Sequence, residues 1–189
     1  KIPSIRFTGG EPLLRPDIYE LLEYAKSKDL NVTVNSNGIL IDETAAKKMN
    51  GLADQVLISI QGTGKTGDKA VGKTGATQAK IKAISNLQKF ANKTKILTAT
   101  VLWSGMMENN GNELDKIHDL IKNIGGISRW HLCRCIPEKK ELYHEDIISY
   151  RNIIDKLIKW QIGKEKFQLH YYPYVISNGI PFCFYDMER

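Results

Sequence analysis

The sequence has few cysteines, no long apolar segment and fewer acidic than basic residues. Its 189 residues include only 3 cysteines, which cannot all pair with one another. A small disulfide-stapled domain is therefore excluded, and the composition favours a reducing, cytoplasmic setting. No apolar run approaches the roughly 20 residues that a bilayer span requires, and no signal peptide is visible, so we expect no membrane partner.

The excess of basic residues invites a nucleic-acid interpretation. The net charge is +6 and the pI is about 9.1. Most of the basic residues are lysines near acidic residues, as Lys26 is near Glu23 and Lys159 is near Asp155. This pattern is typical of solvated helix faces, and no arginine-rich stripe interleaves with aromatic residues. We therefore expect no nucleic-acid partner.

Strand-like and helix-like segments alternate along the chain. We expect strands at 4–7, 32–34, 56–60, 96–102, 130–136 and 167–172, and helices at 16–25, 43–49, 81–91, 114–124 and 147–163. No element is expected in the glycine-rich segment 62–75 or in the aromatic tail from residue 173. Single connecting helices make neighbouring strands parallel. The sequence thus predicts an α/β fold, either a partial barrel or a doubly wound sheet, with too few units for a closed eight-fold barrel.

Small polar and acidic residues follow each of the first three expected strands. These segments are Thr8–Pro12, Asn35–Gly38 and Ser59–Gly62. In parallel α/β sheets the carboxyl ends of the strands carry the chemistry, so these segments form the candidate site. Glycines allow a ligand to approach the backbone closely, and Glu11 offers a carboxylate to an ammonium group. Each segment taken alone is also compatible with an ordinary turn.

These motifs, in this order, resemble the radical S-adenosylmethionine (SAM) superfamily. Ile5–Arg15 is similar to its Gly-Gly-Glu-Pro region, particularly in the molybdopterin-pathway GTP cyclase and the peptide-maturase (SPASM) branches. Asn37–Gly38 resembles its Thr-Asn-Gly turn with Ser36 in place of Thr, and Ile58–Gly62 resembles its Ser-Leu-Asp-Gly strand end with Gln61 in place of Asp. The resemblance implies a partial (β/α)6 TIM-like barrel.

The resemblance also implies roles for individual residues. The Gly9–Glu11 segment would bind the amino group of the SAM methionine moiety, Ser36 and Ser59 would lie near its carboxylate, and Arg134 is a candidate contact to the adenosine. The cofactor-binding residues implied are Gly9, Gly10, Glu11, Pro12, Ser36, Asn37, Ser59 and Arg134. In the family, a [4Fe-4S] cluster reduces SAM to a 5′-deoxyadenosyl radical that takes a substrate hydrogen.

One family feature is missing from this sequence. The three cluster cysteines, spaced Cys-x-x-x-Cys-x-x-Cys, precede the Gly-Gly-Glu-Pro turn in the family, and no such triplet is present here. We therefore expect a core truncated at its N-terminus, lacking the first β/α unit and inactive without its cluster segment. We divide it into a barrel core at 1–165 and, at 166–189, the last strand and the start of a C-terminal extension. Cys183 is the candidate ligand of an auxiliary cluster, and no core metal ligand is expected.

The resemblance implies an enzyme that acts on a peptide or small-molecule substrate with an electron donor such as ferredoxin or flavodoxin. Three alternatives stay open. Gly67–Thr74 matches the Walker A pattern of a P-loop NTPase, although it does not directly follow a strand. His131, Cys133 and Cys135 alternate on one expected strand and are compatible with a soft-metal site. The chain is also compatible with a non-catalytic remnant that binds SAM or a peptide.

Overall fold

Six parallel strands form one continuous sheet in the order of the chain. The computed structural model describes residues 3–102, 104–134, 155–160, 166–172, 174–177 and 180–183. The strands are β1 (Ser4–Phe7), β2 (Asn31–Ser36), β3 (Gln55–Ser59), β4 (Lys95–Leu102), β5 (Ile127–Arg134) and β6 (Gln168–Tyr172). Every neighbouring pair is parallel, so all the carboxyl ends lie along one edge of the sheet.

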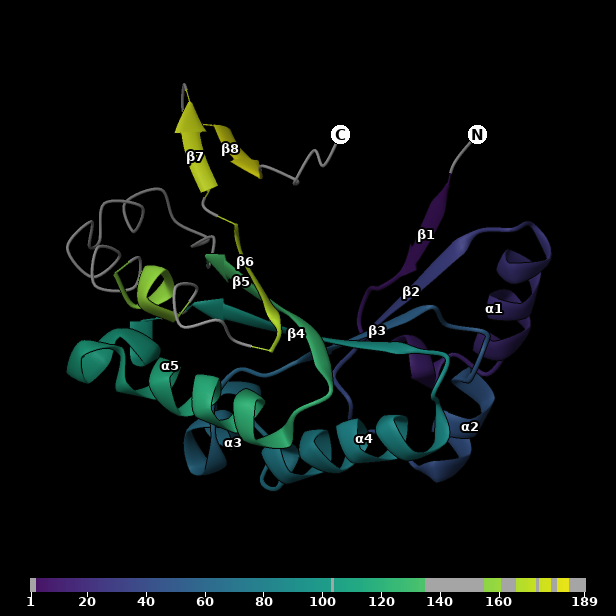
Figure 1. Cartoon of the computed structure of the whole chain (residues 1–189), viewed down its shortest axis with the longest axis horizontal. Helices are drawn as coiled ribbons and strands as arrows, with labels where there is room; N and C mark the ends of the chain where they lie inside the picture. The colour runs from purple at the N-terminus through teal and green to yellow at the C-terminus, as the bar shows by residue number, and fades with distance from the viewer. Residues whose placement is uncertain are drawn as a thin grey trace.

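The helices cover one face of this sheet, and strands β1 and β6 rise on the other side at its two ends (Figure 1). After the 3-10 turn η1 (Pro12–Leu14), the helices are α1 (Ile18–Ser27), α2 (Glu43–Met49), α3 (Gly64–Val71), α4 (Ala76–Phe90) and α5 (Ser104–Ile124). Apolar residues at helical spacing face the sheet, and an Asp42 carboxylate caps the first turn of α2. The one-sided helix layer and the unclosed strand order confirm the partial barrel and contradict the doubly wound alternative.

The strand register defines two faces of the sheet. The helix-facing side carries buried residues such as Val34, Ile58 and Trp130. We call the opposite side the inner face. In β1 and β6 the even-numbered residues lie on it, and in β2, β3 and β4 the odd-numbered residues do. In β5 the odd-numbered residues from Arg129 onward lie on it. Successive side chains of a strand point to opposite faces, so this register decides which side chains can meet one ligand.

Two segments in which no element was expected contain regular structure. Residues 64–71 form α3, which lies directly before α4, and the tail contains a two-stranded antiparallel sheet of β7 (Tyr174–Ser177) and β8 (Ile180–Cys183). Helix α5 also begins ten residues before the expected start at 114. The expected helix at 147–163 lies outside the described residues except for helical residues 155–160.

The last strand of the main sheet belongs to the core by its pairing. Strand β6 pairs with β5 along its length, although the sequence assigned it to the C-terminal segment. The division at residue 165 stays a prediction. Of the helices in the described ranges, none is both long and apolar enough to cross a membrane.

Candidate functional site at the strand ends

The first strand end is a sharp corner built from two glycines and a capping carboxylate. Gly9 has a φ of 132°, which a side chain rarely tolerates, and no heavy atom lies within 4 Å of the Cβ position of either Gly9 or Gly10. Glu11 follows, and its Oε1 accepts a hydrogen bond from the Leu13 N–H at 3.2 Å, while the buried Pro12 opens the η1 turn. The corner therefore leaves its backbone open to a ligand.

The Glu11 carboxylate joins this corner to the end of β2. Ser36 Oγ donates to Glu11 Oε1 at 2.9 Å, and the Asn37 N–H donates to Oε2 at 2.6 Å. Ser36 Oγ in turn accepts from the Gly38 N–H at 2.9 Å. A carboxylate has about four acceptor positions, so one position on Oε2 stays available for a ligand donor. We call this arrangement of Glu11, Ser36 and Asn37 the carboxylate clamp.

Ser36 and Ser59 project from opposite faces of the sheet. Ser36 is the register partner of the fully buried Ile58, which faces the helices, and Ser59 comes one residue later on the inner face beside Ala99. The expectation that both serines lie near one carboxylate group is therefore not met by the strand geometry. Ser36 instead holds Glu11 in place from the helix side.

Asn35 lies on the inner face of β2. It belongs to the candidate segment Asn35–Gly38, but the family resemblance implied no role for it. It pairs with Leu57 in the register, and its Oδ1 is buried without a hydrogen-bond partner among the described residues. A buried, unsatisfied acceptor is costly, so this atom calls for a partner such as a bound ligand or a water molecule. The signal was in the sequence, because Val32 and Val34 alternate onto the helix side and thereby place Asn35 on the other side.

The third strand end is held by a buried glutamate from α5. Glu113 is 7% exposed, and its Oε1 accepts a hydrogen bond from Thr63 Oγ1 at 2.7 Å and another from the Thr63 N–H. Gln61 Oε1 accepts from the Val101 N–H at 2.9 Å, which fastens the same segment to β4. These contacts fix the backbone that follows Ser59, so the three consecutive strand ends are rigidly positioned.

The Walker A alternative is wrong, because its residues lie in a helix and a helix cap. Residues 67–71 belong to α3, and Asp68 accepts hydrogen bonds from the Gly75 N–H at 2.6 Å and the Thr77 N–H at 2.9 Å. These bonds lower the pKa of Asp68. The amide groups at the start of α4 thus bind a carboxylate of the chain itself, whereas a P-loop needs its amides for phosphate.

The other candidate residues lie further along the sheet or outside it. Arg134 is the last residue of β5, and Cys183 is the last residue of β8. His131 and Cys133 share the inner face of β5, whereas Cys135 lies outside the described residues. Among the residues that the structure describes, no group of three or more His, Cys, Asp or Glu side chains is arranged to hold a metal ion.

Comparison with known proteins identifies a family and two kinds of relative. The family model of the Radical SAM superfamily matches residues 1–121. Fe-coproporphyrin III synthase of Methanosarcina barkeri (strain Fusaro / DSM 804) is 39% identical over 87 residues, which are 46% of this chain and 22% of that protein. A probable GTP 3′,8-cyclase of Methanococcus maripaludis is 27% identical over 180 residues, which are 94% of this chain and 58% of that protein.

The fold is shared with a solved structure at low sequence identity. The crystal structure of Streptococcus suis SuiB superimposes with a TM-score of 0.72 and 16% identity, covering 95% of this chain and 43% of that one. At this identity the likeness concerns the fold alone. The chain spans less than two thirds of the length of each curated relative named above.

Proposed function

This chain belongs to the radical SAM superfamily, and from that premise we propose that it forms the SAM-binding core of an enzyme that performs radical chemistry. The residues at the strand ends would hold SAM, whose reductive cleavage would supply a 5′-deoxyadenosyl radical for hydrogen abstraction from a peptide or small-metabolite substrate. An electron donor such as ferredoxin or flavodoxin and a cytoplasmic location belong to the same proposal. A structure of SuiB bound to its precursor peptide SuiA supports a peptide as one kind of substrate.

The residues at the strand ends fit the amino acid part of SAM. The open backbone at Gly9 and Gly10 and the spare acceptor position on Glu11 suit an ammonium group, which needs three acceptors. Asn35 and Ser59 offer donors and acceptors from the inner face to the carboxylate or ribose hydroxyls. Ser36 and Asn37 act on SAM only indirectly, because their hydrogen bonds hold the Glu11 carboxylate. The contact of Arg134 with the adenosine stays a prediction from the family resemblance, because Arg134 shares its register position with Leu102 on the helix-facing side.

The observation that carries this assignment is the unsatisfied Asn35 Oδ1 beside the carboxylate clamp. A ligand that donates a hydrogen bond there would satisfy a group that the described residues leave without one. The [4Fe-4S] cluster does not fit in the same way. The described residues provide no ligand set for it, and the chain's three cysteines lack the family spacing. We therefore give the described residues no role in binding the cluster or in its chemistry.

A reconstitution experiment tests the proposed activity. The full-length protein, supplied with iron, sulfide and a strong reductant, should convert SAM to 5′-deoxyadenosine, which chromatography detects. If SAM binds but no 5′-deoxyadenosine forms in a protein with a spectroscopically intact cluster, the non-catalytic SAM-binding alternative is correct instead.

A pair of asparagine variants on one strand tests the assigned site. Asn35→Ala should weaken SAM binding about tenfold or more, because a hydrogen bond in a buried site is lost. Asn31→Ala is the matched control, since Asn31 lies on the same face of β2 but is exposed at its amino end. Equal SAM affinity in both variants, measured by equilibrium dialysis, would remove Asn35 from the site.

A further inference from the structure

Two consecutive hydrogen bonds link β5 and β4 to the end of β3 on the helix-facing side of the sheet. The indole Nε1–H of Trp130 in β5 donates to Thr100 Oγ1 in β4 at 2.9 Å. Thr100 Oγ1 in turn donates to the Ile60 carbonyl at 2.7 Å. An indole nitrogen can only donate, so the threonine hydroxyl gives its own proton to Ile60 and both bonds have a fixed direction. We call this pair of hydrogen bonds the Thr100 relay.

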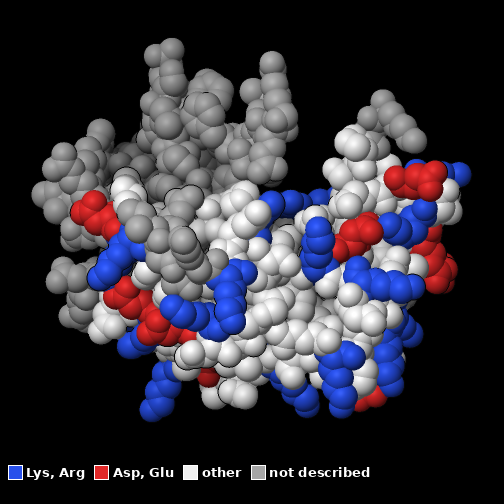
Figure 2. All heavy atoms as spheres, in the orientation of Figure 1, with Lys and Arg blue, Asp and Glu red and all other residues white. Residues whose placement is uncertain are grey.

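The relay is buried and contains no charged group. Trp130 and Thr100 are 0% exposed, and Ile60 is 2% exposed. Charged side chains instead lie on the outside of the molecule, as Figure 2 shows for one face. Breaking a hydrogen bond in such a place is costly, because no water is at hand to replace the lost partner.

Thr100 acts at the point where β3 leaves the parallel sheet. The register of β3 with β4 ends at Ser59. Directly beyond it, the Ile60 carbonyl accepts the hydrogen bond from Thr100 Oγ1, and Gln61 Oε1 accepts from the Val101 N–H at 2.9 Å. Side-chain hydrogen bonds to β4 therefore fix the backbone that follows Ser59.

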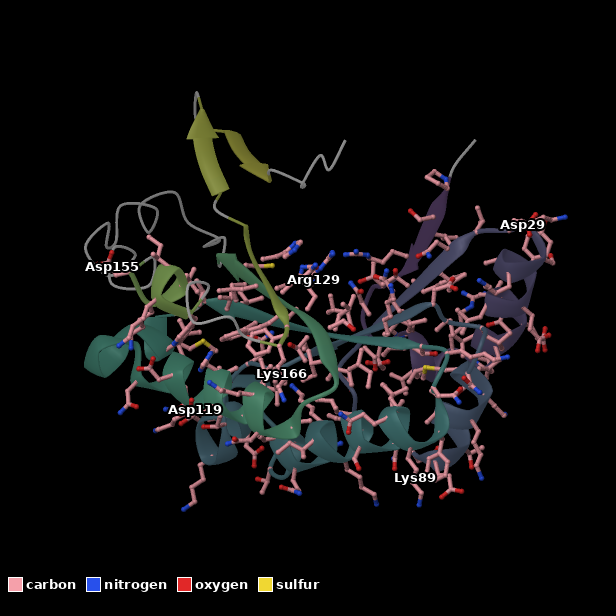
Figure 3. All side chains as sticks on the ribbon, in the orientation of Figure 1. Asp29, Lys89, Asp119, Arg129, Asp155 and Lys166 are labelled. Carbon is pink, nitrogen blue, oxygen red and sulfur yellow. The ribbon has the colours of Figure 1, made fainter. Side chains whose placement is uncertain are left out.

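Rings from three other segments hold the Trp130 indole. Its centroid lies 5.8 Å from that of Trp160, 6.2 Å from that of Phe167 and 6.3 Å from that of His118. Figure 3 labels Lys166, the residue before Phe167, beside the start of β6. These contacts restrict the indole ring, so its N–H stays directed at Thr100.

A second threonine on the same strand and face takes no part in the relay. Thr98 is also fully buried and is the direct register partner of Trp130. Its hydroxyl nevertheless has no hydrogen-bond partner among the described residues, whereas the indole reaches diagonally to Thr100. The indole is thus directed to the threonine that lies beside the end of β3, and Thr98 offers a matched control.

We propose that Thr100 is a positioning residue for SAM, because the relay sets the path of the backbone directly after Ser59. Ser59 lies on the inner face at the proposed SAM position, so a shift of Ile60 would displace the Ser59 hydroxyl from the ligand. This inference rests on the proposed function and deepens it by naming a buried residue, out of contact with SAM, on which the binding of SAM depends.

Two threonine-to-valine substitutions test the relay through SAM affinity. Valine has nearly the shape of threonine, so each variant loses a hydroxyl and little else. In the full-length protein, Thr100→Val should weaken SAM binding about tenfold in equilibrium dialysis, because two buried groups lose their partner. Thr98→Val should change the affinity less than about twofold, since its hydroxyl has no partner to lose. Thr100→Ser keeps the hydroxyl and should retain most of the affinity.

Amide hydrogen exchange tests the same hydrogen bonds without SAM. The Ile60 and Val101 amides should exchange about tenfold faster in Thr100→Val and at an unchanged rate in Thr98→Val. The amides of β2, which pairs on both sides, are the reference for global stability. An equal increase in β2, or no increase at Ile60, would overturn the proposal. Unchanged SAM affinity in a Thr100→Val protein with a loosened β3 end would overturn it as well.

Trp130→Phe tests the relay from its other end if Thr100→Val does not fold. This variant keeps an aromatic ring and removes the N–H donor, so it should speed exchange at Ile60 and weaken SAM binding about threefold. Exchange and affinity equal to those of the wild type would contradict the relay. A wild-type protein that does not bind SAM contradicts the proposed function, whereas the exchange rates decide separately whether Thr100 holds the strand end, so the two failures are distinguishable.

Discussion

Replacing Ser36 by alanine should destabilise the protein strongly, because Ser36 is the centre of the carboxylate clamp. The side chain is 5% exposed and donates to the Glu11 carboxylate while accepting from the Gly38 N–H. A hydrogen bond to a charged group contributes about 1.5–3 kcal/mol, and a buried N–H left unsatisfied costs about 1–3 kcal/mol. Since these effects overlap, we expect Ser36→Ala to lower the free energy of unfolding by about 2–4 kcal/mol.

Urea denaturation followed by circular dichroism measures this change. For a chain of this size, such a loss corresponds to a decrease in Tm of roughly 5–15 °C. Ser59→Ala is the matched comparison, because Ser59 lies on the inner face and its hydroxyl makes no hydrogen bond within the described part of the chain. It should change stability by less than about 0.5 kcal/mol while weakening SAM binding.

A double-mutant cycle with Glu11→Gln isolates the contact between the two side chains. We expect a coupling free energy of about 1–2 kcal/mol, because both groups are part of one hydrogen-bonded network. The reasoning is refuted if Ser36→Ala costs less than about 0.5 kcal/mol, or if Ser59→Ala costs as much. Either result would mean that the two serines do not face opposite sides of the sheet.

Two further predictions concern α3 and the inner face. Gly67→Ala should destabilise the protein by about 2 kcal/mol or more in urea denaturation, because the new Cβ would overlap the Gly62 carbonyl. This loss is expected although alanine favours helices over glycine. The control Lys69→Ala, at an exposed position of the same helix, should cause no such loss. Stability should also fall as the pH decreases from about 6.5 toward 4, because the folded state holds His131 neutral at a pKa of about 4 while the unfolded state takes up the proton nearer its usual 6.5. The urea midpoint of His131→Gln should change less over this range, and identical profiles for both proteins would contradict that assignment.

Much of the strand-helix alternation could be predicted from the sequence, because each element has a local signal. Ile18, Leu22 and Ala25 repeat at helical spacing, and Asp42 marks the start of α2. Helix α3 carries no such signal, since Gly64 and Gly67 are poor helix formers. It forms because Gly67 packs against the Gly62 backbone and Asp68 caps the next helix, and both contacts depend on the folded chain.

The candidate site was predictable in position and less so in detail. Alternation along β2 places Asn35 and Ser36 on opposite sides, because Val32 and Val34 are both fully buried on the helix side. Strand β3 gives no comparable signal, since its run of apolar residues is buried on both faces and hides the period of two. The orientation of Ser59 therefore became known only from the register with β4.

The amino-acid sequence by itself determined the order of the elements, the glycine corner with its carboxylate, and the family to which the chain belongs. Those features depend on residues close together in the chain, so local chemistry is enough to reveal them. Only the tertiary structure decided that Ser36 holds Glu11 from the helix side and that the rings of His131 and His170 meet on the inner face. Both results depend on which strands pair and in which register, and no local pattern encodes that pairing.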